Sequence, residues 1–282
     1  MILYQNGCYI PKEQMFVSPF DHGFLYGIGL FETIRVYDGF PFLLKEHLQR
    51  LNDGLKEMSI DYQLELEEAS VIIQRLLKEN NLRHARIRIN ISAGEGAVGL
   101  PTEPYRNPSV IFFISPLAEP VEQLQEKNAK ILHTLRNTPE TTYRLKSFHY
   151  GNNIAAKMEL QGDLDVEGIF LTKEGYISEA ITSNIFWVKN GVLYTPSQST
   201  GILVGITRQF ILLLAKKLKL PVQEGCFQIE DIMKADEIFL TNSIQEIVSI
   251  KIIDQVGEYA GKKGKVTNRL FNAYKQNRVT IK

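Results

Sequence analysis

The chain has 282 residues, of which 44% are hydrophobic and 23% are charged. This composition excludes collagen-like, low-complexity and disordered chains, and the length allows one large domain or two of moderate size. The 32 basic side chains balance the 32 acidic ones. The basic surface that is typical of nucleic-acid-binding proteins is therefore not expected.

Cysteine and histidine usage argues against metal and disulfide sites. The two cysteines, Cys8 and Cys226, form no CxxC pair, and the five histidines are scattered along the chain. Neither a disulfide scaffold nor a thiolate or histidine metal site is expected. The chain begins without the basic segment and apolar run of a signal peptide, and its longest apolar stretches are too short to span a bilayer. We expect a cytoplasmic protein that binds no membrane.

In the first third of the chain, the pattern predicts strand, turn, strand and helix. Residues 33–37 read as a strand, Asp38-Gly39 as a tight turn, and residues 41–44 as the returning strand. Apolar residues then recur at helical spacing over residues 45–58. The elements expected next are a helix over 67–79 and strands over 86–91, 110–114 and 130–135.

A proline-containing polar stretch marks the best candidate boundary between domains. We predict a smaller N-terminal domain over residues 1–115, a linker over 116–128 and a larger C-terminal domain over 129–282. In the second domain, Asn190-Gly191 is a strong hairpin signal. Its other expected elements are strands over 168–172, 185–188 and 237–240 and a helix over 207–219. Because strands and helices mix without regular βαβ alternation, the predicted fold class is α+β, with any site in the cleft between the domains.

Residues 94–99 match the GxGxxG pattern and follow a predicted strand. A dinucleotide site needs a helix directly afterwards, because the pyrophosphate binds at that helix's N-terminus. Here Pro101 and Pro104 follow, and two prolines so close together are incompatible with a helix interior. We therefore interpret the segment as a flexible glycine-rich loop that can border a pocket, and a nicotinamide oxidoreductase is only a remote alternative.

Three segments stand out from this background. Lys146 lies between an arginine and a histidine, and nearby cations or burial would make its amine nucleophilic, although a solvated surface lysine is the alternative. Residues 201–208 lead into an amphipathic helix whose first N–H groups suit a phosphate, with the Thr207 hydroxyl as a further donor, or Thr207 is a plain N-cap. Glu179 is a lone acid among small and apolar residues just before a strand, or a turn carboxylate.

In this order, and with the opening signature at residues 18–33, the segments resemble the fold type IV pyridoxal-phosphate enzymes. This is the superfamily of the D-amino-acid and branched-chain aminotransferases. The resemblance extends from about Tyr4 to Ile250. It implies a two-domain α+β fold with pyridoxal 5'-phosphate in the interdomain cleft, a small-molecule substrate and a homodimer.

The resemblance also assigns residue roles. Lys146 matches the Schiff-base lysine, Glu179 the carboxylate that pairs with the pyridine nitrogen, and Arg50 the phosphate-binding arginine. These roles agree with the chemistry, because a protonated ring makes the cofactor an electron sink and a phosphate needs fork donors and backbone N–H groups. The remaining cofactor-binding residues expected from the motifs are Tyr150, Asn184, Gly205, Ile206, Thr207, Asn242 and Ser243.

Within the superfamily, residues 144–153 and 240–248 most resemble the aminodeoxychorismate lyases of the Gram-positive type. This implies conversion of 4-amino-4-deoxychorismate to 4-aminobenzoate and pyruvate in folate biosynthesis, with Lys146 as the proton shuttle. A D-amino-acid or branched-chain aminotransferase is the alternative, and a silent binding protein is the third hypothesis.

A substrate with two carboxylates needs cations in its pocket. Arg86 and Arg88 share the polar face of one predicted strand, and we favour Arg88 because it lies nearer the glycine-rich loop. Solvent-exposed strand charges are the alternative interpretation of both arginines. Tyr26, in the opening signature, is the second expected substrate-binding residue.

Overall fold

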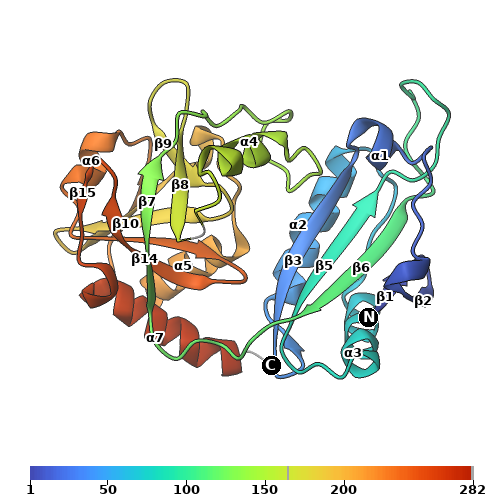
Figure 1. Cartoon of the computed structure of the whole chain (residues 1–282), viewed down its shortest axis with the longest axis horizontal. Helices are drawn as coiled ribbons and strands as arrows, with labels where there is room; N and C mark the ends of the chain where they lie inside the picture. Colours follow the sequence, from blue (N-terminus) through green and yellow to red (C-terminus); the bar gives the residue numbers. More distant parts are fainter. Residues whose placement is uncertain (164, 281–282) are drawn as a thin grey trace. The chain divides into compact units, whose positions relative to one another are not determined.

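The computed structural model describes residues 1–163 and 165–280. The chain divides into two compact units, coloured along the sequence in Figure 1. The first unit comprises Met1–Pro120 and Leu145–His149, and the second comprises Val121–Arg144 and the described residues from Tyr150 to Thr280. This division falls within the predicted 116–128 linker. It also places a short segment that follows the linker back in the first unit.

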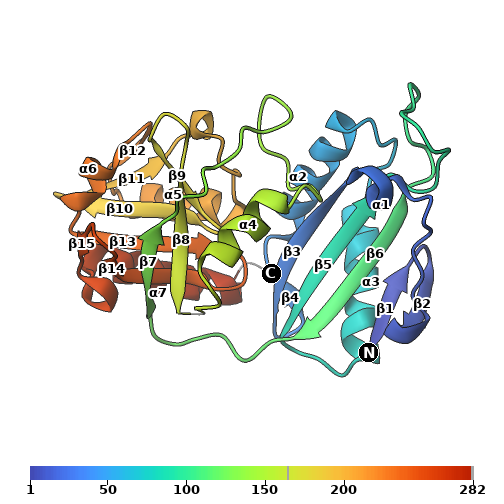
Figure 2. The same ribbon diagram turned by 45° about the horizontal axis from the view of Figure 1, so that its top comes forward.

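A six-stranded sheet forms the first unit, in the order β2-β1-β6-β5-β3-β4. Its strands are β1 (Ile2–Gln5), β2 (Cys8–Pro11), β3 (Gly29–Tyr37), β4 (Phe40–Pro41), β5 (Ala85–Ser92) and β6 (Ser109–Pro116). Its helices are α1 (His22–Tyr26), α2 (Leu44–Glu57), α3 (Leu66–Glu79) and the short 3-10 turn η1 (Lys12–Gln14). Helices α2 and α3 cover one face of the sheet, behind the strands in Figure 2.

The period-two alternation of the strands creates two different faces. In β5, Ile87 and Ile89 are fully buried and belong to the core beneath α2 and α3, whereas Arg86 is exposed and Arg88 is half-buried. The predicted amphipathic strand and both predicted helices are thus confirmed. The Asp38-Gly39 turn is confirmed too, since both residues have positive φ (47° and 82°), which the type I' hairpin requires.

The second unit contains a nine-stranded sheet in the order β12-β11-β10-β13-β14-β7-β8-β9, with β15 paired to β14. Its strands are β7 (Gln125–Ile131), β8 (Val166–Leu171), β9 (Ile177–Ala180), β10 (Asn184–Lys189), β11 (Val192–Pro196), β12 (Val222–Gly225), β13 (Glu237–Asn242), β14 (Glu246–Ile253) and β15 (Gly257–Glu258). Its helical elements are α4 (Gly151–Glu159), η2 (Gln198–Thr200), α5 (Ile206–Lys217), α6 (Ile229–Met233), η3 (Gly261–Lys263) and α7 (Lys265–Thr280). Helices α5 and α7 pack against each other and against β13. The hairpin predicted at Asn190-Gly191 joins β10 to β11.

Two predicted elements differ from the structure. The strand expected over 130–135 is β7, which begins at Gln125, inside the predicted linker. Its first half is polar and mostly exposed, so no hydrophobic pattern indicates it, and parallel pairing with β14 and β8 holds it instead. The returning strand expected over 41–44 ends at Pro41, because Leu44 already begins α2. Within the described part of the chain, no helix is long and apolar enough to cross a membrane.

Candidate active site

Lys146 is fixed to the first sheet by backbone pairing. The N–H of Phe31 donates to the carbonyl oxygen of Lys146 at 2.9 Å, and the N–H of Phe148 donates to Gly29 at 3.0 Å. The segment therefore pairs alongside the first residues of β3. A side chain at position 29 would collide with the Phe148 ring, which explains the glycine there. Lys146 is consequently held on a rigid strand edge, although its sequence context is that of a loop.

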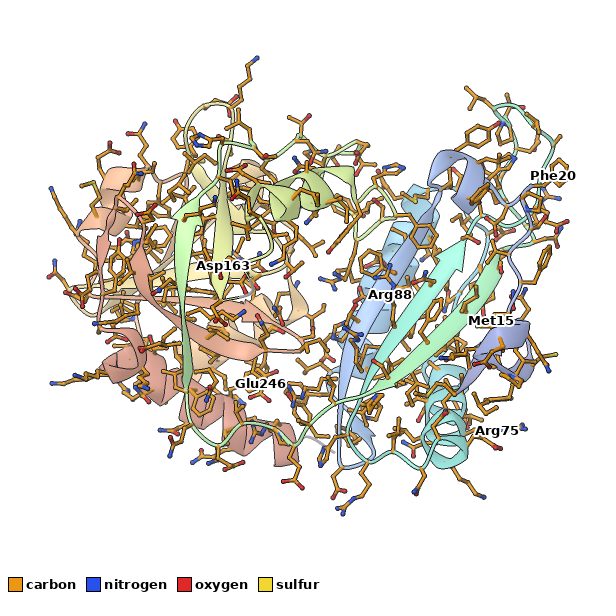
Figure 3. The ribbon with its side chains drawn as sticks, in the orientation of Figure 1. Met15, Phe20, Arg75, Arg88, Asp163 and Glu246 are labelled. Carbon is orange, nitrogen blue, oxygen red and sulfur yellow. The ribbon has the colours of Figure 1, made fainter. Side chains whose placement is uncertain are left out.

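The Phe31 ring brings two predicted site residues together. The Lys146 amine lies 4.5 Å from the centre of this ring, and the Arg88 guanidinium lies 3.7 Å from it. Arg88, labelled on β5 in Figure 3, also donates from Nε to the side-chain oxygen of Asn90 at 2.8 Å. Cations are attracted to the face of an aromatic ring, so Phe31 holds both positive groups at one place on the sheet.

Arg50 lies in a buried ion network that the sequence did not reveal. Its Nε and Nη2 donate to the two carboxylate oxygens of Glu32 at 2.7 and 2.8 Å. The Nδ1 atom of His47 lies 2.7 Å from the Glu32 Oε2 atom. The side chains of Glu32 and His47 are only 1% and 2% exposed. The one indication of this network in the sequence is Glu32 itself, a single carboxylate in the apolar run of β3.

The charges of this network follow from its burial. Burial by itself raises the pKa of Glu32, but Arg50 and His47 outweigh that effect, and the pKa lies well below its usual range. Burial also lowers the pKa of His47, and the attraction of Glu32 offsets this only in part. At neutral pH Glu32 is therefore ionised, and His47 is neutral and donates its Nδ1–H to the carboxylate.

Glu179 forms the centre of a second polar cluster, in the second unit, and is 4% exposed. Arg136 donates to its Oε1 atom from Nε at 3.0 Å and from Nη2 at 2.7 Å, and the Arg144 Nε atom lies 3.8 Å away. The N–H of Leu203 donates to Oε2 at 3.0 Å, with Asn184 at 3.4 Å. This carboxylate is a paired, buried anion rather than an exposed turn residue.

Arg136 is a further site residue that sequence reasoning missed. Its Nη1 atom donates to the side-chain oxygens of Asn152 and Asn153 at 2.8 and 3.1 Å. These two asparagines, at the start of α4, thereby orient the arginine that holds Glu179. Burial, together with the charge of Arg136, lowers the pKa of Arg144 to about 10, so Arg144 also remains a cation at neutral pH.

The N-terminus of α5 has the features expected of a phosphate site. Gly205 is its N-cap residue, and no side chain caps this helix end. A Cβ atom on Gly205 would collide with the side-chain oxygen of Asn184, whose amide donates to Leu203 O at 2.8 Å. Ile206 and Thr207 begin the helix and are each 4% exposed. Uncapped N–H groups at a helix N-terminus bind anions.

Asn242 and Ser243 lie where β13 turns into β14. The Asn242 side-chain oxygen accepts the N–H groups of Ile244 and Gln245 at 2.9 and 2.7 Å, and its amide donates to Ser183 at 2.9 Å. The Asn242 side chain therefore shapes the turn that carries Ser243. Tyr150 lies at the N-cap position of α4.

The glycine-rich loop borders a pocket, as the sequence predicted. A cavity of about 490 Å³ is lined by residues 95–101 and 103–107 together with His22 and Ala93. The Tyr26 hydroxyl accepts the N–H of Gly99 at 2.8 Å, and His22 contacts Ala97 O at 2.9 Å. Residues 100–107 form bends and irregular structure, so the segment lacks the helix that a dinucleotide site requires.

Comparison with known proteins identifies the family. The model of the class IV amino-transferases matches residues 29–253. The chain is 44% identical to an aminodeoxychorismate lyase of Bacillus subtilis over 98% of its own length and 94% of that protein. It is 30% identical to a D-alanine aminotransferase of Staphylococcus epidermidis, over 96% of this chain and 95% of that protein.

Solved structures agree with this assignment. A branched-chain amino acid aminotransferase from T.th., complexed with N-(5'-phosphopyridoxyl)-L-glutamate, superposes with a TM-score of 0.89 at 27% identity. The match covers 100% of this chain and 95% of that one. The chain therefore belongs to the class IV aminotransferases, a family of pyridoxal-phosphate enzymes. The family resemblance, the α+β fold and the pyridoxal 5'-phosphate cofactor predicted from the sequence are confirmed.

Proposed function

We propose that this enzyme is a carbon–oxygen lyase that converts 4-amino-4-deoxychorismate to 4-aminobenzoate and pyruvate, a step of folate biosynthesis. The 44% identity to an aminodeoxychorismate lyase supports this reaction. The observation that carries the proposal is the Phe31 ring, because the Arg88 guanidinium and the Lys146 amine both lie against it. A cation on the aromatic ring that the reactive amine also contacts suits a substrate that carries two carboxylates. We also propose that the enzyme is a cytoplasmic homodimer, as the family resemblance implies.

The chemistry of the described residues fits pyridoxal phosphate. The uncapped N-terminus of α5 and the guanidinium of Arg50 are donors of the kind a phosphate dianion requires. Gly205 lets the start of α5 approach Asn184 closely, because a Cβ atom there would collide with the Asn184 side chain. Glu179 is a buried carboxylate suited to a protonated ring nitrogen, and Lys146 supplies the amine. Only Leu145 separates Lys146 from Arg144, which belongs to the Glu179 cluster.

When bound, the cofactor supplies an electron sink for the carbon that carries the substrate amine. Glu179, paired with Arg136, would hold a proton at the ring nitrogen and so maintain that sink. The free amine of Lys146 would remove the proton from the amine-bearing carbon. The carbon–oxygen bond on the neighbouring carbon of the substrate would then break. Enolpyruvate would leave and take up a proton to become pyruvate, and the six-membered ring of the substrate would become aromatic.

An aminotransferase of D-amino acids or branched-chain amino acids is the second candidate. The D-alanine and branched-chain aminotransferases among the similar proteins support it. Lys146 would remove the proton from the amine-bearing carbon of an amino acid, and water would then release a keto acid while the amino group stays with the cofactor. The catalytic residues proposed above would serve either reaction.

A paired assay on the purified holoenzyme tests the proposal. The formation of 4-aminobenzoate from aminodeoxychorismate is compared with keto-acid formation from D-alanine and from L-leucine. We expect the lyase rate to exceed both transamination rates by at least about a hundredfold, which corresponds to roughly 2.7 kcal/mol in barrier height. Faster transamination than lysis would refute the lyase assignment. A protein that fails to bind pyridoxal phosphate would refute the cofactor site.

A further inference from the structure

Glu32 and His47, the two buried partners of Arg50, have no role in the mechanism above. Glu32 lies on β3 between Leu30 and Ile34, two core residues on the sheet face that α2 covers. His47 and Arg50 are three residues apart on α2 and therefore share one face of that helix. The carboxylate accordingly meets both side chains, although they come from a different element.

Glu32 and His47 do more than balance the charge of Arg50, because they also fix the orientation of its guanidinium. A buried ion pair adds little net stability, because desolvation of the two charges offsets their attraction. Its definite effect here is geometric, since Glu32 engages two donors along one edge of the guanidinium. His47 in turn holds the Glu32 Oε2 atom at 2.7 Å. The guanidinium plane is thus fixed before any ligand binds.

We propose that Glu32 and His47 are positioning residues for the cofactor phosphate, acting through Arg50. This inference rests on the proposed function, because it assumes that Arg50 binds the phosphate. Glu32 grips the Nε–Nη2 edge and so fixes the direction in which the Nη1 side of the guanidinium points. An arginine side chain that is already ordered loses less conformational freedom on binding, which raises affinity.

Loss of this positioning should weaken the binding of the cofactor phosphate and leave the binding of the rest of the cofactor unchanged. Apo-protein is titrated with pyridoxal phosphate and with pyridoxal, which has the same ring and aldehyde but no phosphate. Glu32→Gln should weaken pyridoxal phosphate binding roughly ten- to thirtyfold, the size of the side-chain ordering cost, and leave pyridoxal binding unchanged. Adding Glu32→Gln to Arg50→Ala should weaken binding no further, because the two residues act as one unit.

Two variants of His47 repeat the test without touching the carboxylate. His47→Asn keeps an N–H donor near the Nδ1 position and should bind like the wild type. His47→Leu removes the donor and should reproduce the phosphate-specific loss. This pair of variants also decides the question if Glu32→Gln does not fold. Equal losses for both ligands, or no loss for either, in Glu32→Gln or His47→Leu would overturn the inference.

A matched control separates positioning from general stability. Arg278 and Glu246 form a second buried ion pair, in the second unit, with an N–O distance of 2.7 Å. Arg278→Gln should lower the melting temperature and leave the preference for pyridoxal phosphate over pyridoxal unchanged. A wild-type protein without that preference would contradict the proposed phosphate site itself. A normal wild-type preference that Glu32→Gln also retains would overturn only the positioning role.

Discussion

Glu179→Gln is the most demanding test of the proposed chemistry. The carboxylate accepts from Arg136 at 2.7 and 3.0 Å and from the N–H of Leu203 at 3.0 Å. A glutamine offers one carbonyl oxygen and one NH₂ group, so one end of the new side chain would present donors to donors. Arg136 and Arg144 would also lose their shared counter-charge in a buried place.

The structure sets the expected size of both effects. Removing one partner of a buried ion pair costs about 3–5 kcal/mol, a large part of the roughly 5–15 kcal/mol that stabilises a typical protein. Loss of the negative charge should also weaken the electron sink by at least about 2.7 kcal/mol, which is a hundredfold in rate. An exposed turn carboxylate would instead cost about 1 kcal/mol of stability and leave turnover near normal.

The assay measures 4-aminobenzoate formation per bound cofactor, because this ratio cancels any loss of folded protein. Unfolding in urea gives the stability separately. The double variant Glu179→Gln/Arg136→Gln restores the charge balance, so it should regain part of the stability and none of the turnover. Normal turnover per bound cofactor in Glu179→Gln would refute the reasoning, since Glu179 would then not face the ring nitrogen.

Three further predictions follow from the first unit. Lys146→Ala should keep the fold, since its backbone pairing with Phe31 survives, but lose the cofactor's imine absorbance and nearly all turnover; borohydride trapping of the cofactor on another lysine would contradict this. Arg88→Ala should raise the KM for aminodeoxychorismate at least about tenfold without changing cofactor affinity, whereas exposed Arg86, bonded to Ser115, should tolerate alanine; a wild-type KM in both variants would exclude the role. The lowered pKa of His47 means that the unfolded chain binds a proton near pH 6.5 that the folded chain does not. The free energy of unfolding should therefore fall as pH drops below about 6.5, and less steeply in His47→Asn. Urea titrations at pH 5.5 and 7.5 measure this free energy, and an equal change between the two pH values in wild type and variant would contradict the prediction.

Local patterns in the sequence predict the amphipathic elements and miss those that distant pairing creates. The helices α2 and α3 and the strand β5 each bury one regular face, and the alternation of Ile87 and Ile89 with arginines is visible without a structure. The strand β7 has no such face, because its neighbours β14 and β8 stabilise it through the backbone. The return of Lys146 to the edge of β3 likewise depends on a contact across more than a hundred residues.

The candidate site divides in the same way. Lys146 and Glu179 stand in recognisable motifs, because reactive groups need particular neighbours in the chain. Arg136 and His47 act through side chains on other elements, so their own sequence context carries no signal. A charged residue in a buried strand is the one general indication, since burial of an unpaired carboxylate is too costly to persist. Glu32 meets that criterion in β3, and it points to partners on α2.

The choice between lysis and transamination has to arise from binding rather than from the proton-transfer groups. Both reactions begin when one lysine takes one proton from the amine-bearing carbon, and both use the same electron sink, so Lys146 and Glu179 cannot favour either. Lysis additionally needs a leaving group on the neighbouring carbon, which only the chorismate-derived substrate provides. Residues that select this substrate must therefore recognise its carboxylates. We propose that Arg88 does so, because its guanidinium contacts the same Phe31 ring as the Lys146 amine, and that Arg88 thereby decides which amine reaches Lys146.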